Sequence, residues 1–157
     1  MQTETERKYL VSSVNFKEEA FRKSRIRQGY LSSVPERTVR VRIKDETSFI
    51  TIKGKSDKMG LSRLEWEIEI PLEDGEALLN LCEPGLIDKI RYEIKKGTLI
   101  FEVDEFLGEN LGLIVAEIEL ESENQDFEKP VWLGDEVTGD IRYFNSNLAR
   151  NPYTKWL

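Results

Sequence analysis

The chain has 157 residues, of which 34% are charged and 10% aromatic, and its formal net charge is −7. This composition is typical of one soluble globular domain, residues 1–157, and argues against a nucleic-acid-binding protein, which would carry a basic stripe for phosphates. The absence of histidine excludes Ser–His–Asp and Cys–His catalytic sites and any zinc site built on imidazole.

The sequence shows no signal peptide and no run of about 18 apolar residues, so we expect a cytoplasmic protein without a membrane segment. The single cysteine, Cys82, cannot form an intrachain disulfide. Because Cys82 lies in the apolar run "ALLNLC", we expect a small buried hydrophobic residue rather than a nucleophile.

Apolar and charged residues alternate in several segments, which predicts strands. The first segment is "ETERKYLV", and a shorter one lies around "QGYLSS". The others are "TVRVRIK", "SFITIKGK", "SRLEWEIEI", "DKIRYEI", "LIFEVDEF" and "LIVAEIELE". Turn-forming segments such as "KDET" and "KKGT" separate neighbouring strands. About eight alternating strands are typical of an antiparallel sheet or barrel.

Four segments have helical signals. Asn15 precedes "FKEEAFRKS", and "LEDGEALLNLCEPG" carries an apolar stripe that stops at a Pro-Gly pair. Ser122 and Gln125 form a capping-box pattern in "SENQDF". Asp140 is placed to cap a helix over "IRYFNSNLARN", which ends before Pro152. The fold class predicted is therefore mainly β, with short flanking helices.

Charges of one sign cluster within individual strands. Acids neighbour acids at Glu4/Glu6, Glu65/Glu67, Glu102/Asp104 and Glu117/Glu119, and bases neighbour bases at Arg40/Arg42 and Lys89/Arg91. A solvated outer face would explain one such strand. Like charges on one strand face cost stability, however, and their repetition suggests bound ions of opposite sign. If eight strands close into a barrel with its apolar face outward, these charges line the interior.

An interior with both acids and bases suits a polyphosphate bound together with a metal ion. Hard cations such as Mg²⁺ or Mn²⁺ take carboxylate oxygens as ligands, and arginine and lysine bind phosphate oxygens. Together they would neutralise the charge that develops on a transferred phosphoryl group, and they need neither histidine nor cysteine.

The segment "ETERK" resembles the Glu-x-Glu-x-Lys signature of the CYTH superfamily, the triphosphate tunnel metalloenzymes. The resemblance extends through "RQGYL", "VRVR", "TIK", "SRLEWEIEI", "KIRYEI", "FEVDEF", "AEIELES" and "WLGDEVTGDIRYFNSNLA". It is strongest to short single-domain bacterial members. It implies an eight-stranded antiparallel barrel, or tunnel, with short flanking helices and a C-terminal helix at one end.

The resemblance also implies three sets of site residues. The metal ligands, for Mg²⁺ or Mn²⁺, are Glu4, Glu6, Asp104, Glu117 and Glu119. The phosphate-binding residues are Lys8, Arg40, Arg42, Lys53, Arg63, Lys89, Arg91 and Arg142. The catalytic residues are Glu4, Glu6, Lys8 and Tyr30.

Some of these assignments have alternatives. Tyr30 either handles a proton or is a packed aromatic residue with a hydrogen-bonded hydroxyl. We favour a role for Glu65 and Glu67 in orienting the basic residues over binding a second metal. Ile141 stands where some relatives carry lysine, which leaves Arg142 as the basic contact of the C-terminal segment. Trp132 and Trp156 are expected to be packing anchors.

The resemblance implies metal-dependent hydrolysis of a triphosphate, with inorganic tripolyphosphate as the preferred small-molecule substrate. The alternatives are an adenylate cyclase, which also needs an adenine pocket, and a thiamine triphosphatase. A binding module for polyphosphate or nucleotides would keep the barrel without turnover, and a purely structural barrel would tolerate Glu4→Gln. No nucleic acid or membrane partner is expected, and a homodimer is possible.

Overall fold

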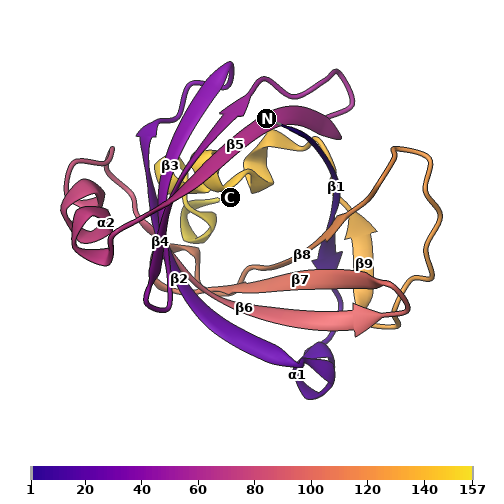
Figure 1. Cartoon of the computed structure of the whole chain (residues 1–157). Helices are drawn as coiled ribbons and strands as arrows, with labels where there is room; N and C mark the ends of the chain where they lie inside the picture. Colours follow the sequence, from indigo (N-terminus) through magenta and orange to yellow (C-terminus); the bar gives the residue numbers. More distant parts are fainter. Residues whose placement is uncertain (1, 157) are drawn as a thin grey trace.

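Eight antiparallel strands close into a barrel in the computed structural model, which describes residues 2–156 (Figure 1). Neighbouring strands follow the order β5-β4-β3-β2-β6-β7-β8-β1, and pairing of β5 with β1 closes the ring. The predicted barrel is therefore confirmed. Its strands are β1 (Gln2–Val11), β2 (Arg22–Ser32), β3 (Arg37–Lys44), β4 (Thr47–Gly54), β5 (Ser62–Ile70), β6 (Ile87–Lys96), β7 (Leu99–Phe106) and β8 (Ile114–Glu119).

A ninth strand, β9 (Leu133–Glu136), pairs with the end of β1 and was not predicted. It is only four residues long and contains Gly134 and Asp135, so its sequence has no alternation from which a strand could be recognised.

The first predicted helix is wrong over most of its length. Helix α1 (Phe16–Glu19) is a single turn, and the chain is already extended at Ala20 (φ −68°, ψ 132°). Strand β2 begins at Arg22 and pairs with β6 along its first seven residues, Arg22 to Gln28. This pairing overrides the helical preference of "FKEEAFRKS", because tertiary context outweighs intrinsic propensity.

The second predicted helix is confirmed as α2 (Leu72–Leu79), which packs on β3 and β4. The cysteine that follows it, Cys82, is partly buried, and burial together with nearby Glu83 raises the pKa of its thiol. A thiol with a raised pKa is a poor nucleophile at neutral pH, because little of it is ionised. None of the helices in residues 2–156 is long and apolar enough to cross a membrane.

The helix predicted at "SENQDF" is absent from residues 121–130, which form a loop. The Gln125 side chain accepts a hydrogen bond from the Glu121 backbone N–H at 2.7 Å, and the Gln125 N–H bonds the Ser122 carbonyl at 3.2 Å. The residues that resemble a capping box therefore close a turn, for which the same local side-chain bonds serve equally well.

The C-terminal helix is present but divided into short pieces. The 3₁₀ turn η2 (Ile141–Tyr143) is capped, as predicted, by the Asp140 side chain, which accepts from the Arg142 N–H at 3.1 Å. Phe144 is extended (ψ 133°) and separates η2 from α3 (Asn145–Arg150). Two further 3₁₀ turns are η1 (Gly108–Asn110) and η3 (Tyr153–Lys155).

The largest apolar core lies outside the barrel wall. Apolar residues on the outer faces of β1, β6, β7 and β8 are covered by α1 and by the segment that leads into β9. Trp132 is fully buried there, packs edge-on against Phe16 and Phe101, and donates its indole N–H to Glu19 at 2.9 Å. Its predicted role as a packing anchor is confirmed.

A second core closes one end of the barrel. Leu148 and Tyr143 of the C-terminal segment pack against Ile87, Phe106 and Val115. Trp156 stacks edge-on against Tyr143 and Tyr153, with ring centroids 5.3 and 5.1 Å away, which confirms it as a packing anchor. The segment therefore converts the tunnel into a cavity with one blocked end.

The fit of α2 on the barrel depends on Gly75, and Gly75→Ala tests it. A Cβ at this position would lie 2.8 Å from the Ser48 Cβ, so either Ser48 or helix α2 would have to shift to make room. Alanine favours a helix by about 1 kcal/mol over glycine, but overpacking a close contact costs about 1–3 kcal/mol. We expect a lower melting temperature in calorimetry. Gly54→Ala, whose nearest neighbour would be 3.8 Å away, is the matched control, and a stabilised Gly75→Ala would contradict the packing.

Candidate active site

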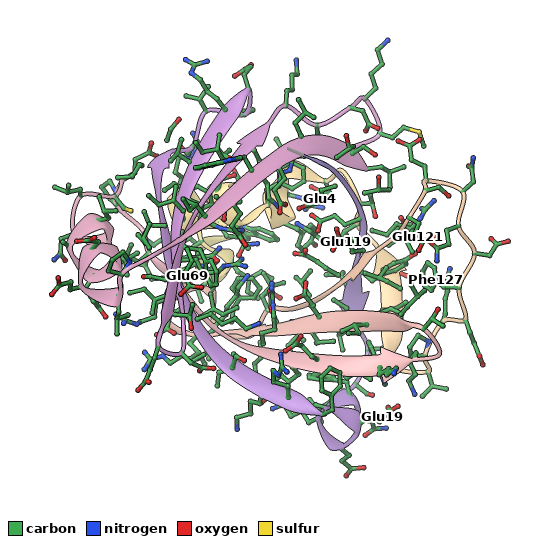
Figure 2. All side chains as sticks on the ribbon, viewed as in Figure 1. Glu4, Glu19, Glu69, Glu119, Glu121 and Phe127 are labelled. Carbon is green, nitrogen blue, oxygen red and sulfur yellow. The ribbon has the colours of Figure 1, made fainter. Side chains whose placement is uncertain are left out.

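A cavity of about 270 Å³ occupies the interior of the barrel and is lined by every strand of the ring and by the C-terminal segment. Figure 2 shows Glu4 and Glu119 pointing into it, whereas Glu19 lies outside beside α1. Twelve of the predicted site residues lie on its wall: Glu4, Glu6, Lys8, Tyr30, Arg40, Arg42, Lys53, Arg63, Lys89, Arg91, Glu117 and Glu119. Glu65 and Glu67 line it as well.

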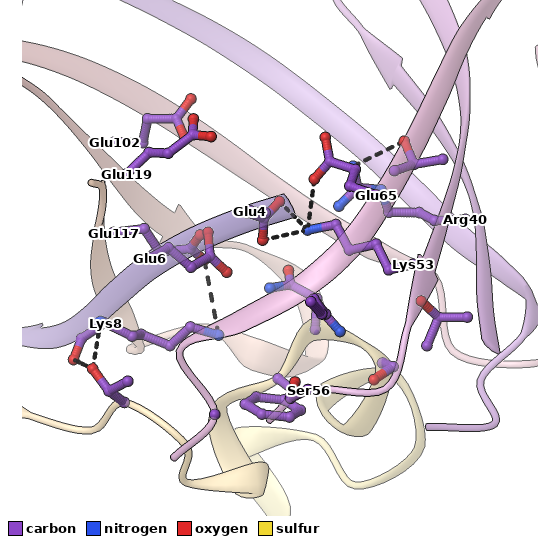
Figure 3. Close-up of a pocket in the computed structure, with 18 of the residues that line it drawn as sticks. Glu4, Glu6, Lys8, Arg40, Lys53, Ser56, Glu65, Glu102, Glu117 and Glu119 are labelled. Atoms are coloured by element: carbon purple, nitrogen blue, oxygen red, sulfur yellow. Dashed lines mark hydrogen bonds and ion pairs between the residues drawn. The ribbon is translucent and has the colours of Figure 1, made fainter. Parts of the chain in front are cut away.

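The first acidic pair is Glu4 with Glu65, and Lys53 lies against both (Figure 3). The Lys53 Nζ is 2.9 Å from the Glu4 Oε2 and 3.4 Å from the Glu65 Oε2. Burial raises the pKa of Glu4, but its hydrogen bond with Glu65 and the charge of Lys53 outweigh this and lower it to about 2. The same hydrogen bond, with burial, raises the pKa of Glu65 to about 7. The two carboxyl groups therefore share one proton, which the pair releases at a pH near 7 rather than near 4.5.

Glu6 of β1 and Glu117 of β8 form a second acidic pair. Burial and the charges of Glu117 and Glu4 raise the pKa of Glu6 well above its usual value. Burial also raises the pKa of Glu117, but Lys8, Arg91 and a hydrogen bond from Glu6 outweigh it and hold that pKa well below normal. Glu6 is thus the member of the pair that holds a proton more tightly, and Glu117 is the member that ionises more readily.

The acidic wall has the donor chemistry of a site for a hard divalent cation, because four buried or half-buried carboxyl groups from β1 and β8 face one cavity. In the described chain, residues 2–156, no three acidic side chains converge closely enough to hold an ion. In the Glu4–Glu65 pair and in the Glu6–Glu117 pair, one carboxyl group has a raised pKa and the other a lowered one, and a bound cation would favour the ionised form of both. The chemistry and charge of these carboxyl groups fit a divalent metal ion. Their side chains would have to move closer together to bind it.

One predicted metal ligand, Asp104, is not among the residues that line the cavity, which corrects its expected placement on the wall. It is 1% exposed and absent from the cavity wall. Its oxygens accept two hydrogen bonds from Arg91, at 2.8 and 2.9 Å, and lie 2.7 Å from the Lys89 Nζ. Burial raises its pKa, but these two cations outweigh burial and lower it to about 2. Both carboxylate oxygens of Asp104 therefore contact cations. Glu102, two residues earlier, is the residue of β7 that lines the cavity.

The basic wall gathers cations from β3 and β6. Burial lowers the pKa of Lys89 to about 7, against the charge of Asp104. Burial and the charges of Arg40 and Arg91 lower the pKa of Arg42 to about 9. Cations crowded in this way favour a bound anion, which would offset their repulsion.

The predicted orienting role of Glu65 and Glu67 agrees with their contacts. Glu65 lies beside Lys53, and Glu67 accepts a 2.5 Å hydrogen bond from the Thr51 hydroxyl and lies 3.7 Å from the Arg40 guanidinium. Thr51 also accepts from Arg40 at 3.1 Å. Thr51 was not predicted, although its alternation with Lys53 on β4 places both on the inner face.

The C-terminal segment closes the inner end of the cavity with Phe144 and Asn145. The Lys8 Nζ donates to the Tyr143 carbonyl at 3.2 Å and lies 5.0 Å from the centroid of the Phe144 ring, beside which Arg63 also lies at 5.9 Å. Neither Phe144 nor Asn145 was predicted as a site residue.

Arg142 lies outside the cavity, which corrects its predicted placement as a phosphate-binding residue. Its guanidinium is 2.7 Å from Asp140, and its side chain is 58% exposed. Because Asp140 accepts from both the backbone and the guanidinium of Arg142, the side chain is held at the surface. Ile141 is also exposed, so neither side chain contributes to the cavity wall.

Barrel, charged cavity and blocked end together define the tunnel architecture that the sequence predicts. The family model of the CYTH domain matches residues 2–153, and the chain belongs to this family. An inorganic triphosphatase of Acetivibrio thermocellus is 49% identical over 98% of this chain and 97% of its own. An inorganic triphosphatase of Nitrosomonas europaea is 38% identical over 94% of this chain and 97% of its own.

Solved structures agree with the family assignment. The crystal structure of the inorganic triphosphatase NE1496 superposes with a TM-score of 0.68 at 35% identity and covers 95% of each chain. A protein of Pyrococcus horikoshii has a TM-score of 0.62 at 24% identity over 77% of this chain and 80% of its own, a likeness that shows the shared fold alone.

The shared proton of Glu4 and Glu65 predicts that the free energy of unfolding of the metal-free protein depends on pH. The pKa of Glu65 is raised from its ordinary 4.5 to about 7, so the folded state disfavours its ionisation, and stability falls as pH rises through this range. Glu65→Gln removes the ionisation. After a discount for the partial exposure of Glu65, we expect the variant to gain about 1 kcal/mol over the wild type at pH 8 compared with pH 5. This corresponds to roughly 2–4 °C in melting temperature.

The measurement is thermal unfolding of both proteins with a chelator present, at each pH. Glu69→Gln, an exposed position on the same strand, is the control and should show the same difference from wild type at both pH values. A Glu65→Gln difference that is equally independent of pH would contradict the shared proton.

Proposed function

We propose that this chain is a metal-dependent triphosphatase that hydrolyses inorganic tripolyphosphate to pyrophosphate and phosphate. One observation carries the proposal: a single cavity with one blocked end has carboxyl groups of β1 and β8 on its wall together with arginine and lysine residues of β3 and β6. A triphosphate with its metal ion has the charges that complement both. The naming of two relatives as inorganic triphosphatases supports the same activity.

In this proposal Glu4, Glu6, Glu117 and Glu119 hold Mg²⁺ or Mn²⁺, which would neutralise phosphate charge and polarise the scissile P–O bond. Glu4 would exchange Lys53 for the metal, which leaves the Lys53 ammonium available to a phosphate oxygen. The carboxyl proton on Glu6 would be released in the same exchange. Asp104, which the resemblance also assigns to the metal, would fix Arg91 and Lys89, with which it forms ion pairs.

The phosphates lie against the basic wall. Arg40, Arg42, Lys89 and Arg91, with Lys8 and Arg63 from the neighbouring strands, bind the non-bridging oxygens and stabilise the pyrophosphate that leaves. Tyr30 of β2 lines the cavity, and its hydroxyl is the group that we propose handles a proton of the attacking water. No histidine or cysteine is needed for this hydrolysis.

The lining of the cavity favours an inorganic substrate over a nucleotide or thiamine triphosphate. Apart from Tyr30, Leu61 and Phe144, the side chains on its wall are polar or absent. The Phe144 ring already has two cationic partners, Lys8 and Arg63, 5.0 and 5.9 Å from its centroid, with which a base or a thiazole would have to compete. A homodimer and a cytoplasmic location stay predictions.

The first test is turnover of tripolyphosphate and ATP with Mg²⁺, with Mn²⁺ and with no metal, with the products resolved by ion-exchange chromatography. We expect metal-dependent release of phosphate and pyrophosphate from tripolyphosphate, with ATP a slower substrate. Cyclic AMP from ATP would assign the protein to the adenylate cyclases instead. Binding of tripolyphosphate without turnover would leave only a binding module.

Glu4→Gln separates the proposed metal site from a structural barrel. It removes one metal ligand and the partner of Lys53, and we expect at least about 10²-fold lower turnover together with weaker Mn²⁺ binding in calorimetry. Glu121→Gln, exposed and outside the cavity, is the control and should retain both. Full activity in Glu4→Gln would show that the acidic wall holds no catalytic metal.

A further inference from the structure

The proposed phosphate site contains two amide side chains whose partners are cations. Gln28 of β2 is fully buried, and its Oε1 accepts a 2.8 Å hydrogen bond from the Arg42 Nε. Its Nε2 donates to the Asn145 Oδ1 at 3.2 Å. The same Asn145 oxygen accepts from the Lys89 Nζ at 2.9 Å. Both acceptor oxygens are therefore directed at cations of the basic wall.

These bonds form one continuous chain across the inner end of the cavity. It runs from Arg42 through Gln28 and Asn145 to Lys89, and Lys89 is joined to Arg91 through Asp104. The residues come from β3, β2, α3, β6 and β7, and Asn145 is 117 positions from Gln28 in the sequence. The chain can form only when the C-terminal segment is docked.

We propose that Gln28 and Asn145 are positioning residues of the phosphate site, which makes the C-terminal segment a working part of that site. The inference rests on the proposed function, since it assigns Lys89 and Arg42 to phosphate binding.

The arrangement has a physical rationale in the crowding of cations. Lys89 is fully buried, and three donors on its ammonium group must be directed. Asn145 accepts from one of them at 2.9 Å, and Asp104 lies 2.7 Å away as the ion-pair partner, so the ammonium group is held in one place at the cavity wall. Gln28 likewise takes the Arg42 Nε and leaves its terminal nitrogens for the substrate.

Neutral amides suit the positions of Gln28 and Asn145 better than carboxylates would. An acid would satisfy the same donors, but it would also cancel the positive charge that attracts the phosphate and would repel the ligand. An amide oxygen orients an ammonium or guanidinium group and leaves its net charge intact.

Asn145→Leu tests the proposal. It keeps the approximate size of the side chain and removes the acceptor shared by Lys89 and Gln28. We expect tripolyphosphate to bind about tenfold more weakly to the metal-free variant in calorimetry, with KM raised by a similar factor and kcat changed less than about threefold. Asn147→Leu, two residues along α3 and away from the cavity wall, is the control and should bind as wild type does.

A role for Asn145 limited to fastening the segment would lower the melting temperature and leave the affinity and KM unchanged. That result would overturn the inference, whereas metal-dependent turnover by the wild type would still support the proposed function. If the wild type neither binds nor hydrolyses tripolyphosphate, the proposed function fails and the inference fails with it.

Gln28→Met supplies an independent variant, and Asn145→Ser replaces Asn145→Leu if the latter does not fold. Because both amides belong to one chain of bonds, the loss of affinity in the double variant should be clearly smaller than the product of the two single losses. Fully multiplicative losses would show two unrelated contacts and would overturn the linked arrangement.

Discussion

The structure depends on burying many charges of both signs inside one small barrel. An isolated buried ion is very costly, so charged residues of the interior are stabilised by partners of opposite sign, by a shared proton or, for Arg42, by the Gln28 amide. Asp104 meets this need for two cations at once, and Lys53 meets it for Glu4 and Glu65. The ion pairs are thus the condition under which the barrel can close with its polar face inward.

Closing in this way reverses the usual distribution of a small domain, in which the apolar core lies at the centre. Here the apolar residues of the strands face outward, and α1, α2 and the segment before β9 supply the cover that makes them a core. Helix α2 covers the outer face of β4 only in part, and Ile52 of β4 and Trp66 of β5, which lie opposite each other, are 40% and 41% exposed. The flanking elements therefore provide most of the apolar burial, while the interior is left free for charge.

The sequence predicts the face on which each residue lies, because the period of two is strict along a strand. Twelve of the site residues that the family resemblance implies lie on the cavity wall, on the inner faces of their strands. The same period carries no information about depth along the barrel. Glu102 and Asp104 share a face of β7. Asp104, however, lies directly opposite Arg91 in the register of β6 and β7 and accepts a hydrogen bond from it. Only the register distinguishes a wall residue from a buried partner.

Short segments outside the strands are predicted less well, because the same local bonds serve several structures. Ser122 and Gln125 carry the chemistry of a helix cap and form a turn, and Asp140 caps its helix but also draws Arg142 out of the cavity. Gln28 is uncharged and lies in a segment recognised mainly for Tyr30, so nothing in its own chemistry marks it. Its alternation with Tyr30 places it on the inner face, where it pairs with Arg42 across β2 and β3.

The paired charges also explain how a site can be preorganised before substrate arrives. The cations of β6 are fixed by Asp104, so their geometry does not depend on a phosphate being present. Glu4 and Glu6 are instead held by a lysine and by protons, which are exchangeable partners. A rigid basic wall and an adjustable acidic wall suit a ligand whose phosphates must be held in place while its metal is admitted, because electrostatic preorganisation is most valuable where charge develops.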